Sequence, residues 1–172
     1  GIDGVLFADF ENTTYQKLGW TVTGSAFGNE PVPRWWNQPA QGHLGQRMAS
    51  SYVDGDWHVN SKLTSPEFTI AGNCINFLIG GGNHPGETCV NLIVGGNVVR
   101  STTGDDSDLM RWAGWNVAEF KGQTARIEVV DNHGGFWGRI YIDQITFSDM
   151  LTDHRREHAK WVEMSPDFFA PK

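Results

Sequence analysis

The stretch Ala125–Val130, with the sequence ARIEVV, alternates apolar and polar side chains over its first five residues. A similar alternation runs through Ile140–Phe147, with the sequence IYIDQITF. A period of two is typical of a β-strand that has one face against a core and the other in solvent. These two segments therefore predict strands of a sheet that is buried on one side.

Further short apolar runs lie between clusters of Gly, Asn, Asp and Pro, and no amphipathic helical pattern precedes residue 151. The tripeptide Gly95-Gly96-Asn97 separates two Val-rich runs and predicts a tight hairpin turn. Many short strands with regularly spaced turns indicate an all-β fold, a β-sandwich or jelly roll of two antiparallel sheets. The other runs are Val5–Phe10, Trp20–Thr23, Met48–Val53, Glu67–Ile70, Ile75–Ile79, Val90–Val94, Val98–Ser101 and Trp112–Val117.

The length of 172 residues suits one domain with a substantial core. We assign residues 1–149 to the sandwich. Residues 150–172 lack strand alternation, and we interpret them as a C-terminal appendage or as the boundary with a neighbouring catalytic domain. The chain starts at Gly1 and shows no signal peptide, so we expect a mature protein or an excised domain.

The net charge of -7 argues against a nucleic-acid partner, because phosphate binding requires a basic face. No apolar run reaches the length of about 18 residues that a membrane span needs. The two cysteines, Cys74 and Cys89, fall at opposite ends of adjacent predicted strands, roughly 20 Å apart, too far for a disulfide. We expect both thiols to be free and mostly buried.

In an antiparallel arrangement every second loop lies at the same end of the sandwich. Counted from the predicted hairpin, loops 54–62, 80–88, 102–111 and 131–138 then share one end. Charged side chains there suit sugar hydroxyls, because bidentate contacts discriminate hydroxyl orientation, although each could equally be a surface ion-pair partner. The candidate carbohydrate-binding residues are His84, Glu87, Arg100, Arg111, Asp131, His133 and Trp137.

The tryptophans divide into core and ligand candidates. We expect Trp20 and Trp115 in the core, since most Trp side chains in a sandwich of this size are buried. Trp57 and Trp137 are flanked by polar loop residues and are candidates for contact with a ligand. The pair Trp35-Trp36 forms either a separate exposed patch or a surface that packs against a neighbouring domain.

A structural calcium ion is a further expectation. Asp9 and Glu11 close the first predicted strand, and Asp143 lies in the last one. Terminal strands of a jelly roll commonly pair, and calcium prefers hard oxygen ligands such as these carboxylates and nearby carbonyls. The alternative is that Asp9 and Glu11 only cap an edge strand, and the spacing favours neither reading.

Catalysis by the chain itself is not expected. Asp54-Gly55-Asp56 and the acidic residues of 105–108 could supply a carboxylate pair for glycoside hydrolysis. Such acids in glycine-rich loops are more often turn formers, through bonds from side chain to backbone. The sequence also lacks a nucleophile elbow, a Walker loop, a dinucleotide fingerprint and an HExxH helix.

Several segments together carry a family resemblance, of which Phe77–Leu92, with its GGGNH run at 80–84, is the most distinctive. The others are Asp9–Glu11, Gly19–Gly24, Leu63–Phe68, Val98–Arg100, Ala125–Asp131 and Asp143–Ile145. With these segments, residues 5–149 resemble carbohydrate-binding module family 66, apart from Val32–Gln46 and the GFWG run at 135–138. The resemblance implies a β-sandwich attached to fructan-degrading enzymes of glycoside hydrolase family 32, binding terminal fructose units of levan or inulin.

The segment Trp161–Ala170 is similar to a short stretch inside β-fructosidase catalytic propellers, but the chain lacks their Asn-Asp-Pro nucleophile motif. We therefore expect a secreted or cell-surface, non-catalytic fructan-binding module that holds a covalently attached hydrolase near its substrate. The alternatives are a structural or protein-interaction sandwich without sugar binding and, less favoured, a stand-alone glycosidase. No nucleic-acid or membrane partner is expected.

Overall fold

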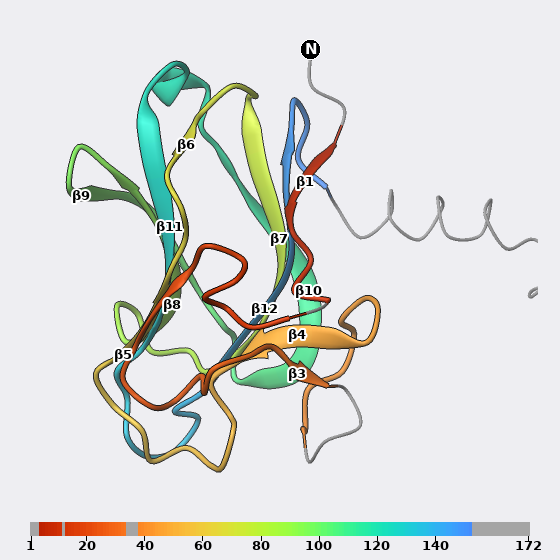
Figure 1. Cartoon of the computed structure of the whole chain (residues 1–172), viewed down its shortest axis with the longest axis vertical. Helices are drawn as coiled ribbons and strands as arrows, with labels where there is room; N and C mark the ends of the chain where they lie inside the picture. Colours follow the sequence, from red (N-terminus) through yellow and green to blue (C-terminus); the bar gives the residue numbers. More distant parts are fainter. Residues whose placement is uncertain (1–3, 12, 34–37, 153–172) are drawn as a thin grey trace, which may run out of the picture.

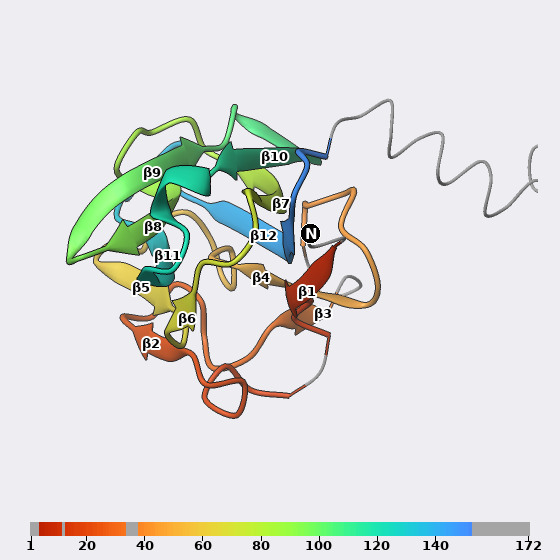
Figure 2. The same ribbon diagram turned by 90° about the horizontal axis from the view of Figure 1, so that it is seen from above.

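The computed structural model describes residues 4–11, 13–33 and 38–152. Its strands form two antiparallel sheets that pack face to face, which confirms the predicted all-β sandwich. Figure 2 shows the two sheets as separate layers. Within the described ranges the only helical segment is the 3₁₀ turn η1 (Ala118–Phe120), and no helix there is long and apolar enough to cross a membrane.

Each sheet contains six strands (Figure 1). The first sheet consists of β1 (Val5–Ala8), β3 (Val32–Pro33), β4 (Arg47–Ser50), β7 (Cys74–Gly81), β10 (Ser107–Asn116) and β12 (Ile140–Ser148). The second consists of β2 (Thr21–Thr23), β5 (Ser61–Thr64), β6 (Phe68–Thr69), β8 (Thr88–Val94), β9 (Asn97–Thr103) and β11 (Thr124–Asp131). The strand orders are β10-β7-β12-β4-β3, with β1 on β12, and β2-β5-β11-β8-β9, with β6 on β11.

Every apolar run predicted as a strand overlaps a strand of the structure. The prediction missed β3, which is too short to show an alternation. It placed the start of β5 in the loop 54–62 and the start of β10 in the loop 102–111. The first residues of β10, Ser107–Arg111, are rich in polar side chains because β10 is an edge strand of the first sheet. The loop expected at 102–111 is therefore reduced to 104–106.

The hairpin between β8 and β9 has the predicted tight turn. Val94 pairs with Asn97, so Gly95 and Gly96 are the two turn residues. Their φ angles of 59° and 78° lie in the left-handed region that primed hairpin turns require and that glycine adopts without strain.

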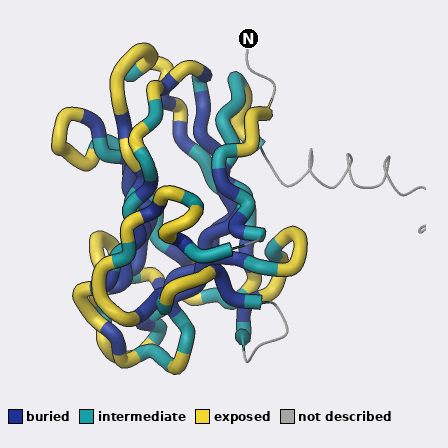
Figure 3. The backbone as a smooth tube through the Cα atoms, viewed as in Figure 1, coloured by how far each residue is buried: buried dark blue, intermediate teal, exposed yellow. Residues whose placement is uncertain are grey.

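The core lies between the two sheets. The buried strand residues in Figure 3 (dark blue) line this interface, and most of the exposed tube belongs to the loops at the two ends. Trp20 and Trp115 are only 4% and 5% exposed, which confirms their prediction as core residues. Trp115 packs against Phe77, and its indole N–H donates to the Thr102 hydroxyl at 2.9 Å, so its single polar group is satisfied.

A second, smaller cluster covers the outer face of the first sheet. Residues 38–53 cross this face, and Gln41 forms a parallel β-bridge with Leu109 of β10. The buried members of the cluster are Val32, Ala40, Met48, Leu78, Met110 and Tyr141. This part of the sheet is therefore covered by the chain itself and does not offer an open binding platform.

Cys74 and Cys89 are free and buried, as predicted. The stated reason was wrong in one respect, because β7 and β8 belong to different sheets and are not adjacent paired strands. Two other predictions concern residues outside the described ranges. They are the Trp35-Trp36 patch and residues 153–172 of the C-terminal segment, so the domain boundary remains a prediction.

Candidate functional site

Four loops meet at one end of the sandwich, as predicted from the antiparallel order. They are residues 51–60, 82–87, 104–106 and 132–139, and Figure 1 shows the first (orange to yellow) and the last (blue) at the lower end. Hydrogen bonds join them in pairs. Loops 51–60 and 132–139 are joined by the Asn60 N–H, which donates to Asn132 Oδ1 (2.9 Å), and by the Gly135 N–H, which donates to the Asp56 carbonyl (2.9 Å). The Asn132 N–H also donates to the Glu87 carbonyl of loop 82–87 (2.7 Å). The Asn83 N–H donates to Asp106 Oδ1 of loop 104–106 (2.7 Å).

Arg139, at the entrance to β12, holds this loop end together. Its guanidinium donates to Asp56 at 2.8 Å and to Asp108 at 3.2 Å. The same group lies over the rings of Trp137 and Tyr52, with its central carbon 4.1 and 5.1 Å from the ring centroids. The Arg139 side chain is only 15% exposed, so these ion pairs are partly shielded from water.

Asp56 and Asp108 are two of the acids considered for glycoside hydrolysis, and both bind Arg139. Asp108 also accepts a hydrogen bond from the Tyr141 hydroxyl at 2.7 Å. Burial, together with this bond, raises the pKa of the Tyr141 phenol above its usual range. These contacts give Asp56 and Asp108 a structural role at the loop end, and neither is free to act with the other as a catalytic carboxylate pair.

Three of the predicted binding residues lie together at this end. The imidazole rings of His84 and His133 stack in parallel, with centroids 3.5 Å apart and an angle of 11° between their planes. His133 Nδ1 lies 3.4 Å from the Glu87 carboxylate, and His84 Nε2 donates to the Phe136 carbonyl at 2.9 Å. Glu87 is exposed and the two rings are partly exposed, so polar groups from loops 82–87 and 132–139 face solvent side by side.

Trp137 also belongs to this end, but Arg139 covers one face of its ring. Its indole is partly exposed, and its φ of 60° is unusual for a residue other than glycine. Arg111 reaches the same end from β10, where Nε donates to Asp105 at 2.9 Å. Trp137 and Arg111 are therefore at the expected end, each held by an ionic neighbour.

The placement of Arg100 with these residues was wrong. Arg100 lies in the middle of β9, and its guanidinium contacts the opposite end of the sandwich, where Nε donates to the Asn116 carbonyl at 3.1 Å. It also pairs with Glu119 of η1 and lies over the Phe120 ring. The prediction counted Arg100 with the loop-end residues although it lies within the predicted strand Val98–Ser101. β9 continues to Thr103, and the Arg100 guanidinium contacts Asn116 and Glu119 instead of the loops.

Asp131 is at the correct end but is not exposed. It is the last residue of β11 and is 0% exposed, so its carboxylate does not reach the surface where a ligand would bind. Burial raises the pKa of this carboxyl to about 7, and a hydrogen bond from Ser51 opposes that rise. Asp131 is therefore a support beneath the loop end, a correction to its prediction as a sugar contact.

The three predicted calcium ligands also approach one another. β1 pairs with β12 as expected. Asp143 lies at a bulge in β12, between the residues of β12 that pair with β4 and those that pair with β1. Asp143 is fully buried, and burial raises its pKa to about 8, with the charges of Glu11 and Asp9 adding to the rise. Such a group of carboxylates is the donor set that calcium prefers.

Loop 41–46 covers these carboxylates. Its Leu44 N–H donates to Asp143 at 3.0 Å, and its Gln46 N–H donates to Glu11 at 2.8 Å. Within residues 4–11, 13–33 and 38–152, no three His, Cys, Asp or Glu side chains are arranged closely enough to hold a metal ion. The residue types therefore fit calcium, while the carboxylate oxygens of Glu11 and Asp143 are occupied by backbone amides.

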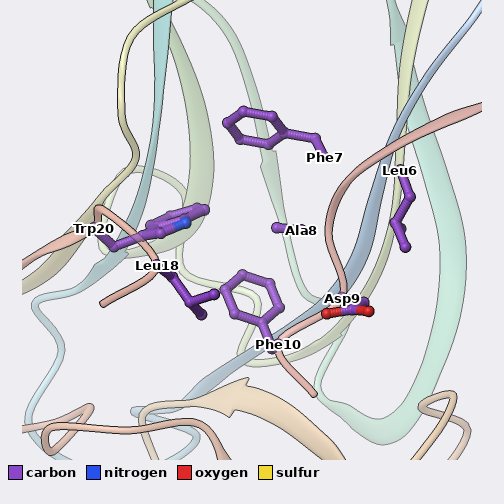
Figure 4. A pocket seen from close by; sticks show the side chains of 7 residues that line it. All are labelled: Leu6, Phe7, Ala8, Asp9, Phe10, Leu18 and Trp20. Carbon is purple, nitrogen blue, oxygen red and sulfur yellow. The ribbon is translucent and has the colours of Figure 1, made fainter. Parts of the chain in front are cut away.

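A cavity of about 190 Å³ lies elsewhere, beside β1. Figure 4 shows Phe7, Phe10 and Trp20 around Ala8. Asp9 is the only charged residue in its lining, and the other residues are apolar. This cavity offers few hydrogen-bond partners, whereas recognition of a sugar needs many.

One important residue of the loop end, Arg139, was missed by sequence reasoning. It makes two ion pairs there, and its only sequence signal is its position directly before the apolar start of Ile140–Phe147. Asp56 was expected at this end, but the only role considered for it was that of a catalytic acid. Its pairing with a residue more than 80 positions away has no local signal in the sequence.

Comparison with known proteins gives a sequence relative that covers almost the whole chain. No family model matches the chain. A protein of Aspergillus rugulosus, ecdE, whose name assigns it to the glycosyl hydrolases, is 37% identical over 171 residues. The match covers 98% of this chain but only 24% of that protein, so the chain spans about a quarter of its relative.

Solved structures with similar folds are much more distant in sequence. A cyclase from Fischerella sp. TAU is 13% identical with a TM-score of 0.50, covering 84% of this chain and 96% of its own, which shows the fold alone. Two carbohydrate-binding modules have TM-scores of 0.46. The module of family 29 is 14% identical, and the match covers 86% of this chain and 93% of the module. The module of family 61, in complex with β-1,4-galactotriose, is 16% identical, and the match covers 82% of this chain and 98% of the module.

The buried carboxyl of Asp131 predicts a pH dependence of stability. An unfolded Asp loses its proton near pH 4 (about 3.9), whereas folded Asp131 keeps its proton to about pH 7. Between these values the folded state binds more protons, so its contribution to the free energy of unfolding falls as pH rises. In the parent protein this decrease should be about 4 kcal/mol between about pH 4 and pH 8, and Asp131→Asn should remove it, as measured by urea unfolding.

The exposed residue Asp105 provides the control. Asp105→Asn should keep the pH dependence of the parent protein over the same range. Identical pH dependence in the parent and in Asp131→Asn would contradict the assignment of a buried, proton-binding carboxyl to Asp131.

Proposed function

We propose that this chain is a non-catalytic carbohydrate-binding module whose loop end binds the terminal fructose of levan or inulin. The observation that carries the proposal is the convergence of His84, His133 and Glu87 on a loop end braced by Arg139. A furanose presents several hydroxyls and little flat apolar surface. Hydrogen-bonding groups should therefore contribute more than aromatic stacking to its recognition.

The loop end supplies such groups on a rigid support. His84 and His133 offer ring nitrogens, Glu87 offers acceptors, and Arg111 adds a cationic donor from β10. Trp137 lines the same end, with its outer surface partly exposed. Because Arg139 already binds the adjacent loops in the free protein, little conformational freedom would be lost when a sugar binds.

The sequence relative supports a proposal for the role of this domain. A chain that matches about a quarter of a protein named as a glycosyl hydrolase has the size of an accessory domain. We infer that this module is attached to a fructan hydrolase outside the cell and keeps that enzyme near its polymer. The benefit comes from a higher effective concentration of substrate.

Two arginines form a matched pair for testing the site. Both make one ion pair with a carboxylate, but Arg111 lies at the loop end and Arg100 at the opposite end. Arg111→Ala and Glu87→Ala should weaken retention on levan or inulin by about tenfold or more, through the loss of charged contacts to the sugar. Arg100→Ala should bind like the parent in affinity electrophoresis, with cellulose and xylan as controls.

The results separate the competing functions. Loss of binding in Arg100→Ala together with normal binding in Arg111→Ala would place the site at the other end. A parent protein that is retained on no polysaccharide would favour a structural or protein-interaction domain. Release of reducing sugar from fructan by the purified chain would instead support a stand-alone glycosidase.

We also propose a structural calcium ion held by Asp9, Glu11 and Asp143. The support is the position of these acids where β1 joins β12, and the burial of Asp143 close to two other negative charges. A divalent cation would neutralise this charge, and nearby carbonyls would complete its oxygen shell. The ion would then tie the first strand to the last one.

Calcium that binds only the folded state raises the melting temperature in proportion to the logarithm of its concentration. The melting temperature should fall by several degrees after chelation and recover when calcium, but not magnesium, is added. Asp143→Asn should make melting insensitive to calcium. A parent protein whose melting temperature is unchanged after exhaustive chelation would rule the site out.

A further inference from the structure

Trp57 is a large apolar side chain that is held rigidly at the surface. It is 65% exposed, yet its ring stacks on the ring of His58 at a centroid distance of 3.8 Å and an angle of 26°. Its indole N–H also donates to the Asp54 carbonyl at 3.3 Å. One face of the indole therefore packs on protein, and the high exposure shows that much of the remaining surface is free.

The ring beneath Trp57 is itself fixed on both sides. His58 is only 4% exposed. The Ser25 hydroxyl lies 2.7 Å from Nδ1, and the Asp54 carboxylate accepts a hydrogen bond from Nε2. His58 thus links the loop after β2 to loop 51–60, and it gives Trp57 a support that does not rotate.

Trp57 adjoins the proposed fructose site. A methyl group added at Gly134 would lie only 3.2 Å from the Trp57 carbonyl oxygen, and Gly134 is next to His133 in the chain. The following residues continue the contact, since Gly135 donates to the Asp56 carbonyl and the Phe136 carbonyl accepts from His84. The backbone of Trp57 and the stacked histidines are therefore joined by one short segment, 133–136.

We infer that Trp57 is a second sugar subsite, one that takes a pyranose ring next to the fructose in the proposed site. A pyranose presents a flat face of C–H groups that can cover an aromatic ring, whereas a furanose has little such surface. The inference rests on the proposed function and narrows its ligand. The favoured ligand is a glycan end in which a terminal fructofuranose is linked to a hexopyranose, as in sucrose itself.

Three small sugars test this inference by isothermal titration calorimetry with the whole chain. They are fructose, a disaccharide of two fructofuranoses, and sucrose. The parent should bind sucrose about fivefold to tenfold more tightly than the other two, through the aromatic face that sucrose buries. Trp57→Ala should lose this preference and keep the affinity for fructose, and Trp57→Phe should retain part of the preference.

Val98→Ala is the control, because Val98 is an exposed apolar side chain beside the β8–β9 hairpin turn. It should leave all three affinities unchanged. Equal affinity of the parent for the three sugars, or an undiminished preference in Trp57→Ala, would overturn the subsite while leaving fructose binding intact. If the parent binds none of the sugars and no fructan, both the proposed function and the subsite fail.

Discussion

The guanidinium of Arg139 joins three segments that are far apart in the sequence: loop 51–60, the start of β10 and the start of β12. Its two carboxylate partners are mostly shielded, and removal of the arginine would leave both negative charges without a counter-ion in a partly dehydrated region. His133, Trp137 and Trp57 lie on loops that this ion-pair network connects, and His84 stacks on His133. The order of the candidate site therefore depends on a residue that is not proposed to touch the sugar.

Most of the fold could be predicted from local patterns. The alternation in Ala125–Val130 and Ile140–Phe147 marks β11 and β12, and a glycine pair marks the hairpin between β8 and β9. Very short strands such as β3 carry no such signal, because a period needs several residues to be visible. The assignment of each strand to a sheet depends on contacts between distant segments, so the two cysteines were placed on paired strands when they lie in different sheets.

The location of the candidate site was more predictable than its composition. Antiparallel order alone brings the four loops to one end, and His84, Glu87 and His133 are placed there as expected. How deeply each side chain is buried, and which way it points, could not be predicted, because a change of a few residues in where a strand ends changes both. The guanidinium of Arg100, in the middle of β9, contacts the other end, and the extension of β11 to Asp131 buried that carboxylate.

The central claim is that sugar binds where these loops meet. Its most direct test is a titration of the isotope-labelled chain with an inulin-type oligosaccharide, followed by mapping of the backbone amide chemical shifts. The account predicts saturable shifts confined to residues 54–60, 82–87, 104–111 and 132–139. Shifts concentrated around Arg100 and η1, or along the cavity beside β1, would contradict it.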